Sequence, residues 1–313
     1  MRLSRFDFKI TLLLTVIVYS SLRFSVYAQD LEPRAYSNLP VGLNFLLTGY
    51  TFSNGSVLFD PAVPLENANI NIHGSLFAYA RSISLGKMSG KVDMILPYVW
   101  LSGTADFQGE PVSRTVSGLG DPRVRMTLNL LGAPALSANE FKNYKQNMII
   151  GVSLQMFMPL GQYDPEMLVN IGTNRFTFKP ELGISKTIKS LFLELAVGAA
   201  FYTVNHDFYQ GKTRSQAPIG SIQGHGIYNF KGGMWLAVDG TYYWGGRTTL
   251  EGVEGNDLQK NTRLGLTYAM PVNKHHSLKL NLSTGVSTRT GSDFNVAALV
   301  WQYRWGRDFG KKN

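Results

Sequence analysis

Ten charged residues stand at alternate positions of segments in which polar and apolar residues alternate. In 122–130, for example, Arg123 and Arg125 alternate with Val124 and Met126. Successive side chains of a strand point to opposite faces, so such charges share one face of a sheet. Inside a barrel they could select solutes by charge, or they could merely neutralise one another. The candidate pore-lining residues are Arg123, Arg125, Arg175, Lys179, Glu181, Glu194, Asp239, Arg263, Lys279 and Arg304.

Catalytic and metal-binding motifs are weak in this sequence. The chain has no cysteine, which excludes thiol nucleophiles, disulfides and cysteine–zinc sites. It has no Gly-x-Ser-x-Gly elbow and no His-Glu-x-x-His motif. His206 and Asp207 fall in an expected outer loop, where an outer-membrane hydrolase could keep its catalytic groups, although a polar loop is the simpler interpretation. We expect no enzyme activity, no cofactor and no metal, with a barrel-borne lipase or protease as the alternative.

The N-terminus has the organisation of a cleavable signal peptide. Arg2, Arg5 and Lys9 precede the apolar run 10–18, which is shorter than the ~20 residues of a spanning helix. Val26-Tyr-Ala28 then supplies the small residues that signal peptidase requires. We expect cleavage after Ala28, which lowers the formal net charge of +9. Export and the dispersed charge both argue against a nucleic-acid partner.

Beyond residue 28 the sequence alternates with a period of two, as strands do and helices do not. Mean hydropathy is near zero (−0.06), because alternating strands average two unlike faces. Most segments reach the ~9–11 residues with which a tilted strand crosses a bilayer. About twelve segments show the pattern: 40–52, 70–83, 91–102, 120–131, 147–159, 174–186, 190–204, 217–230, 233–245, 261–271, 276–289 and 294–305.

The connections between these segments differ in length. If the N-terminus is on the inner side, the outer connections are mostly long: 53–69, 103–116, 160–173, 205–216, 246–260 and 290–293. The inner ones are mostly short: 84–90, 132–146, 187–189, 231–232 and 272–275. Outer-membrane barrels show this asymmetry. The long inner connection 132–146 has room for a helical turn.

Aromatic residues collect near the ends of several segments, on the apolar face. Amphipathic rings favour the two membrane–water interfaces, although large aromatics also simply suit strands. The candidate membrane-interface aromatics are Tyr98, Trp100, Tyr242, Trp244, Trp301, Tyr303 and Trp305.

Together these features predict an all-β fold, a transmembrane antiparallel up-and-down β-barrel of about 12 strands (range 10–14). A soluble sandwich also alternates, but strand length, loop asymmetry and the signal peptide favour a barrel in the bacterial outer membrane. Expected partners are outer-membrane lipid, a small solute and the barrel assembly machinery. The expected divisions are 1–28 signal peptide, 29–38 N-terminal periplasmic segment, 39–305 barrel and 306–313 C-terminal periplasmic tail.

Particular stretches carry a family resemblance. They include 117–125 (SGLGDPRVR), 159–165 (PLGQYDP), 170–185 (NIGTNRFTFKPELGIS) and 301–305 (WQYRW). Together the chain resembles, over residues 30–305, the outer-membrane transporter family named for the meta-cleavage pathway of phenol degradation. The resemblance implies passive uptake of small hydrophobic or aromatic compounds, and it transfers no binding residues. A structural or adhesive barrel without transport is a further alternative.

The membrane location has a direct test. A folded barrel resists unfolding by detergent at room temperature, so unboiled protein from the membrane fraction should migrate differently from boiled protein on a gel. Identical migration, or recovery of the protein in a soluble secreted fraction, would contradict the barrel prediction.

Overall fold

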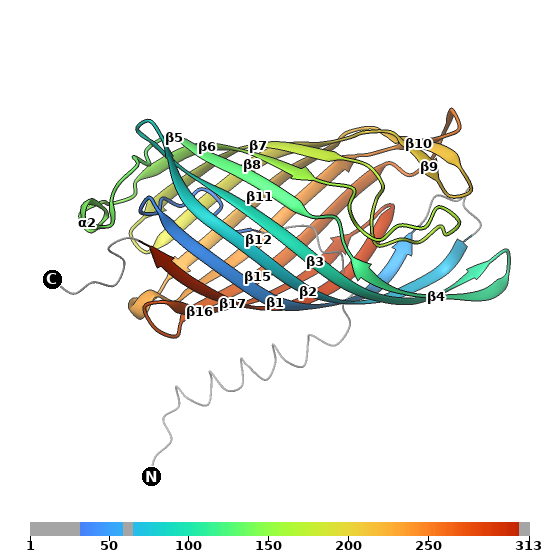
Figure 1. Ribbon diagram of the computed structural model, residues 1–313, viewed down its shortest axis with the longest axis horizontal. Helices are drawn as coiled ribbons and strands as arrows, with labels where there is room; N and C mark the ends of the chain where they lie inside the picture. The colour runs from blue at the N-terminus through green and yellow to red at the C-terminus, as the bar shows by residue number, and fades with distance from the viewer. Residues whose placement is uncertain (1–31, 59–64, 307–313) are drawn as a thin grey trace, which may run out of the picture.

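The computed structural model describes residues 32–58 and 65–306, which form a β-barrel (Figure 1). The strands of its wall are β1 (Leu43–Leu58), β2 (Leu65–Leu85), β3 (Met88–Phe107), β4 (Glu110–Leu119), β5 (Arg123–Leu131), β6 (Met148–Phe157), β7 (Thr177–Ile188), β8 (Leu191–Tyr202), β11 (Ile219–Asn229), β12 (Trp235–Gly245), β15 (Gln259–Pro271), β16 (His276–Ser287) and β17 (Gly291–Gly306).

The wall is one antiparallel sheet closed on itself. Except between β4 and β5, each wall strand pairs with the wall strands before and after it in the chain, and β1 pairs with β17 from Leu43↔Gly306 to Leu58↔Gly291. β4 and β5 share one position in the wall, because both pair with β3. The thirteen strands therefore fill twelve positions, as the sequence pattern predicted. Closure pairs backbone groups that would otherwise each cost several kcal/mol in lipid.

The two ends of the barrel are built differently (Figure 1). One end, here named the α2 end, carries short turns, the helix α2 (Ala138–Phe141) and the 3₁₀ turn η1 (Lys231–Gly233). Ser137 and Glu140 form a capping box on α2, so the predicted helical turn in 132–146 is present. The opposite end, named the β4 end, carries a small sheet of β9 (Asn205–Phe208), β10 (Lys212–Gln216), β13 (Thr248–Leu250) and β14 (Val253–Glu254).

The prediction that residues 103–116 form an outer loop was wrong. These residues continue β3 and β4 as a hairpin beyond the rest of the wall. Its turn consists of Gln108 and Gly109, both with positive φ (53° and 85°), as in the two-residue turns that match the twist of hairpin strands. The signal for a strand was present, because Val112 and Val116 alternate with the polar residues Ser113, Thr115 and Ser117.

Side-chain exposure distinguishes the barrel from a soluble sandwich. The exterior face is apolar and exposed, and the interior face buries polar groups. Val238 on the exterior is 58% exposed, whereas the next residue, Asp239, is fully buried. An exterior of this kind requires an apolar solvent. Within the described part of the chain, no helix is long and apolar enough to span a bilayer.

The expected signal peptide lies outside the described residues, as do residues 307–313 of the expected C-terminal tail. Both divisions remain predictions.

Closure between the first and last strands can be tested by cross-linking, because the chain contains no cysteine. Tyr50 and Leu299 are direct cross-strand partners on β1 and β17. Opposite residues in an antiparallel pair are close enough for a disulfide, so Tyr50→Cys with Leu299→Cys should form a reducible cross-link. Tyr50→Cys with Leu264→Cys on β15 is the control and should not. A cross-link in the control alone would contradict the register.

Candidate functional site

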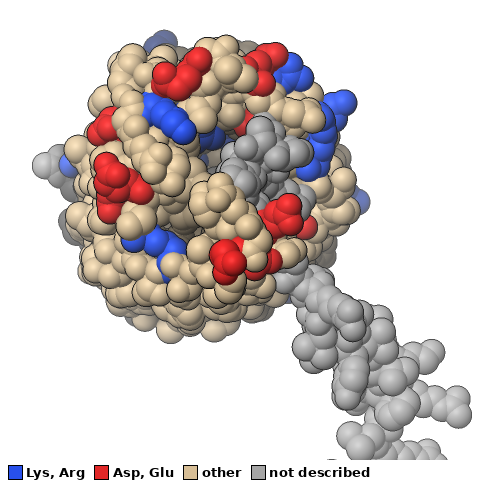
Figure 2. All heavy atoms as spheres, turned by 90° about the vertical axis from the view of Figure 1, so that its right-hand side faces the viewer, with Lys and Arg blue, Asp and Glu red and all other residues tan. Residues whose placement is uncertain are grey.

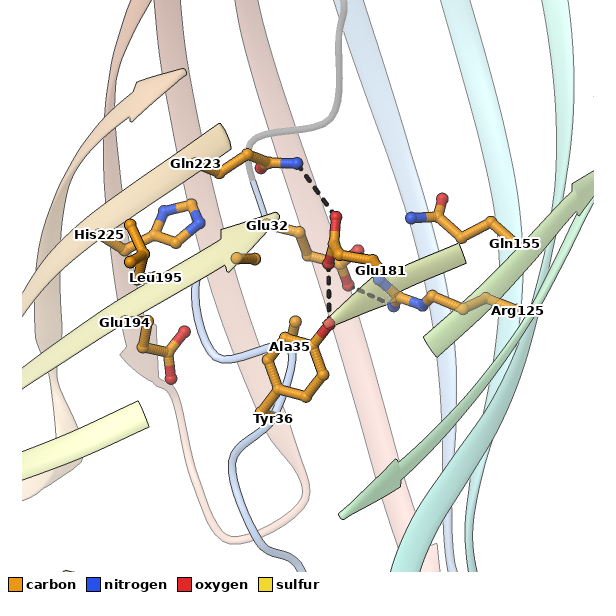
Figure 3. Close-up of a pocket in the computed structure, with 11 residues that line it drawn as sticks. Glu32, Ala35, Tyr36, Arg125, Gln155, Glu181, Glu194, Leu195, Gln223 and His225 are labelled. Atoms are coloured by element: carbon orange, nitrogen blue, oxygen red, sulfur yellow. Dashed lines mark hydrogen bonds and ion pairs between the residues drawn. The ribbon is translucent and has the colours of Figure 1, made fainter. Parts of the chain in front are cut away.

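Residues 32–38, which are part of the chain that precedes β1, lie inside the barrel. Residues 32–38, here named the plug, contact the interior faces of β6, β7 and β8, and the side chain of Tyr36 is only 2% exposed. The sequence predicted an N-terminal periplasmic segment at 29–38, preceding a barrel at 39–305. The plug differs from that assignment because its polar side chains find partners on the interior face (Figure 3).

Two glycines leave room for the ring of Tyr36 against the wall, and this position is here named the seat of Tyr36. Gly151 on β6 and Gly183 on β7 are cross-strand partners. A Cβ atom at Gly183 would lie 1.9 Å from Cε2 of Tyr36, and one at Gly151 would lie 2.5 Å from its Cδ1. Only glycine lets the ring approach the wall this closely. The Tyr36 hydroxyl donates a hydrogen bond to Oε1 of Glu181 at 2.9 Å.

An ion-pair cluster fixes the start of the plug. The guanidinium of Arg125 binds both carboxylate oxygens of Glu32, with Nη2–Oε1 at 2.6 Å, and its Nε donates to Asp93 at 2.9 Å. Arg123 also pairs with Asp93, at 3.2 Å. Both arginine side chains are 5% exposed. Removing one partner from so buried a cluster typically costs about 3–5 kcal/mol.

Arg34 fastens the middle of the plug on the other side of the interior. Its backbone N–H donates to Oε2 of Glu194 at 2.7 Å, and its guanidinium donates to the side-chain carbonyl of Asn229. The guanidinium also lies 4.8 Å from the ring centroid of Trp235, within cation–π range. The plug is thus bound to strands on both sides of it.

The remaining interior charges of the central wall are largely paired. Lys179 lies 3.3 Å from Glu181. Asp239 accepts hydrogen bonds from Thr267 at 3.0 Å and contacts His225 at 2.7 Å. This His225–Asp239 pair was missed from the sequence, because cross-strand register alone brings the two residues together. Mutual neutralisation, one of the two interpretations left open above, therefore describes this part of the wall.

The other four candidate pore-lining residues lie apart from the plug. Arg263 is buried on the interior face and donates to the Ser283 hydroxyl at 3.0 Å. Lys279 is half-buried on the interior face of β16. Arg175 is buried at the β4 end. Arg304 lies at the α2 end, where its Nε donates to the carbonyl of Lys274. The structure therefore does not bring the ten residues into one ring, and their role as pore lining remains a prediction.

Little free space remains beside the plug. The cavity between the plug and the polar wall is about 20 Å³. That volume holds about one water molecule. Its lining residues include Glu32, Tyr36, Arg125, Gln155, Glu181, Glu194, Gln223 and His225 (Figure 3). An aromatic ring has no room on this side of the interior while the plug is seated.

The opposite part of the interior is apolar, and sequence reasoning missed it. On β2, β3 and β17, Ile70, Leu101, Phe294 and Val296 form a buried cluster on the interior face. Val169, from the connection between β6 and β7, packs against this cluster, so that connection folds into the β4 end. The sequence feature that could have revealed this apolar part is a run in which both faces of a strand are apolar. Residues 94–101 form such a run, and the alternation disappears there.

The wall has a weak seam beside this apolar cluster. β4 pairs with β3 on one edge, and its other edge forms no ladder with another described strand. That edge is held instead by the β6–β7 connection. Gln162 N donates to Leu119 O at 2.7 Å, and Arg114 Nε donates to Val169 O at 3.4 Å. Individual hydrogen bonds of this kind open more easily than a continuous ladder.

The predicted interface aromatics lie on the exterior in close pairs. Tyr98 and Trp100 have ring centroids 4.7 Å apart on β3, and Tyr242 and Trp244 have theirs 5.8 Å apart on β12. On β17, near the α2 end, the rings form a row of Trp301, Tyr303 and Trp305. Their role at the membrane interfaces stays a prediction.

No catalytic arrangement forms around the histidine singled out from the sequence. His206 and Asp207 lie in β9, and both are exposed. Within residues 32–58 and 65–306, no group of three or more histidine, aspartate or glutamate residues could hold a metal ion.

Sequence comparison places the chain in a family. The family described as "Putative MetA-pathway of phenol degradation" matches residues 50–301. The chain belongs to this family. No curated protein matches the sequence.

Solved structures of outer-membrane barrels share the fold. The COG4313 outer membrane channel from Pseudomonas putida F1 is 19% identical, with a TM-score of 0.75 over 88% of this chain and 100% of the channel. The transport unit of the autotransporter AIDA-I from Escherichia coli is 11% identical, with a TM-score of 0.50 over 92% of this chain and 97% of that unit. At these identities the likeness shows an outer-membrane barrel fold.

The ion pair of the plug generates a prediction about conductance. Glu32→Gln removes the charge that Arg125 holds while keeping the side-chain size, so the plug should leave its seat more often. Single-channel recordings in planar bilayers should then show a larger or more frequently open conductance than the unchanged protein.

Glu254→Gln is the matched control, because Glu254 forms an exposed ion pair with Arg247 at the β4 end. Exposed pairs contribute about 0–1 kcal/mol, so this variant should conduct like the unchanged protein. Unaltered conductance in Glu32→Gln would show that the ion pair does not hold the barrel closed.

Proposed function

We propose that this protein is an outer-membrane channel for the passive uptake of small apolar compounds, aromatic compounds among them. The α2 end would face the periplasm and the β4 end the outside, in keeping with the short turns at one end and the long connections at the other. The observation that carries the proposal is the apolar part of the interior, formed by residues such as Ile70, Leu101 and Phe294.

An apolar interior wall suits an apolar solute. Contact with such a wall stabilises a solute by roughly 25 cal/mol for each Å² of apolar surface removed from water. The polar wall on the other side, with its buried ion pairs, gives the same solute no comparable gain. A general pore for sugars or ions would need the reverse arrangement, with water along the whole interior.

The positions of the plug and the seam together suggest a route for an apolar solute through the barrel. The plug blocks the polar part of the interior, and the cavity beside it is too small for a ring. The apolar cluster adjoins the seam along β4, where Gln162 and Arg114 supply single hydrogen bonds in place of a ladder. We infer that an apolar solute enters at the β4 end and leaves sideways through this seam into the membrane. The solute would then never cross the plug.

The test uses a fluorescent apolar aromatic probe, N-phenylnaphthylamine, which intact outer membranes exclude. Gram-negative cells that produce the protein should take up the probe faster than cells carrying an empty vector. Hydrolysis of a hydrophilic β-lactam by a periplasmic β-lactamase should be unchanged, which controls for general leakage. Probe uptake at the empty-vector rate would contradict the proposed function.

A disulfide across the seam tests the route. A Cβ atom at Gly118 would lie 2.7 Å from Cβ of Gln162, so a shift of about 1 Å gives disulfide geometry. Gly118→Cys with Gln162→Cys should slow probe uptake under oxidising conditions and recover on reduction. Either single substitution is the control. Rapid uptake through the oxidised double variant would rule out the seam while leaving the function itself intact.

A further inference from the structure

Two arginines at the β4 end are stacked on aromatic rings. Arg175 precedes β7, and its guanidinium carbon lies 4.3 Å from the ring centroid of Tyr202, the last residue of β8. Arg214, in β10, has its guanidinium carbon 5.0 Å from the ring centroid of Phe208. Arg175 is only 9% exposed. Figure 2 shows this end of the molecule, with basic and acidic side chains spread around its rim.

Carboxylates act on the two guanidinium groups only from a distance, Asp121 on Arg175 and Asp257 on Arg214. Among the described residues, neither forms an ion pair with a carboxylate. Arg175 donates from Nη2 to the neutral amide of Gln216, and its Nη1 is buried without any described hydrogen-bond partner. Burial and the nearby charge of Arg214 lower the pKa of Arg175 to about 10, and burial also lowers the pKa of Arg214. Both remain cations at neutral pH.

The neighbouring acids are already engaged. Asp121 accepts hydrogen bonds from Gly161 N, Thr173 N and the Thr173 hydroxyl. Asp257 accepts two from the backbone and the hydroxyl of Thr248. These carboxylates fix the connections at the β4 end, and neither pairs directly with Arg175 or Arg214.

The arginine pair beneath the plug provides an internal comparison. Arg123 and Arg125 are buried like Arg175, whereas Arg214 is half-buried, and they share the carboxylates of Asp93 and Glu32. Buried cations without such partners are costly, and a carboxylate is the anion that fits the planar fork of a guanidinium. At the β4 end the two cations are in place, and no carboxylate of the described residues binds either of them directly. The rings of Tyr202 and Phe208 add aromatic surface next to the charges.

We propose that Arg175 and Arg214 form a binding site for an aromatic carboxylate at the β4 end of the barrel. The carboxylate would bind both guanidinium groups, as Asp93 binds both arginines beneath the plug, and the aromatic body would pack beside the rings that flank them. The site goes beyond the proposed function, because an aromatic carboxylate is an anion and the solutes proposed above are apolar. Binding itself requires no transport.

The test is calorimetric titration of the purified full chain in dodecyl maltoside, at neutral pH and constant ionic strength. Benzoate should bind saturably, and benzyl alcohol and inorganic phosphate should bind about tenfold more weakly or not at all. Arg175→Gln and Arg214→Gln should each weaken benzoate binding about tenfold, since each removes a charge-assisted hydrogen bond.

Lys212→Gln is the matched control, because Lys212 lies in the same strand as Arg214, near the ring of Tyr209. It should leave benzoate binding unchanged. Heat-modified gel migration shows whether each variant is folded. If Arg175→Gln does not fold, Arg214→Gln and the ligand series on the unchanged protein still decide the question.

Three results would overturn the site: benzoate binding no better than benzyl alcohol, phosphate binding as well as benzoate, or loss of binding in Lys212→Gln equal to that in the arginine variants. The uptake assay uses an uncharged probe in cells, and the titration uses a charged ligand in detergent. The uptake proposal and the binding-site proposal can therefore each fail without the other.

Discussion

The structure depends on the closure of the sheet that forms its wall. Lipid offers no hydrogen-bond partner, so a sheet in a bilayer is stable only when closed. The ladder between β1 and β17 completes that closure. Once the wall is closed, its two faces meet different surroundings, and the period-two pattern of the sequence follows. The exterior accepts apolar side chains, and polar side chains turn inward, where they need partners.

The plug, a segment of the same chain, supplies partners for polar side chains of the interior. Arg125, Glu181 and Glu194 on the wall are satisfied by Glu32, Tyr36 and the backbone of Arg34. Closure of the barrel and closure of the pore are thus linked, because the same buried charges that stabilise the interior also fix the plug. The apolar cluster needs no such partner. It lies in a part of the interior that the plug leaves alone, and the proposed solute route runs beside it.

The sequence predicted the wall well and the interior poorly, for physical reasons. Alternation reports which face meets lipid, so each of the twelve predicted segments corresponds to a wall position. Pairing across the interior depends on register between distant strands, as for His225 and Asp239, and no local pattern reports it. The plug was missed because residues 32–38 have no strand pattern, and their partners lie far along the chain. The apolar cluster was missed because alternation disappears where both faces are apolar.

The central claim is that the plug is seated while apolar solutes use the apolar part of the interior. A crystal structure of the protein soaked with bromobenzene tests both halves at once, because bromine gives an anomalous signal. The account predicts bromine peaks against Ile70, Leu101, Phe294 and Val296, with Tyr36 in its glycine seat. Bromine peaks along the polar wall around Arg125 and Glu194, with the plug displaced, would contradict it.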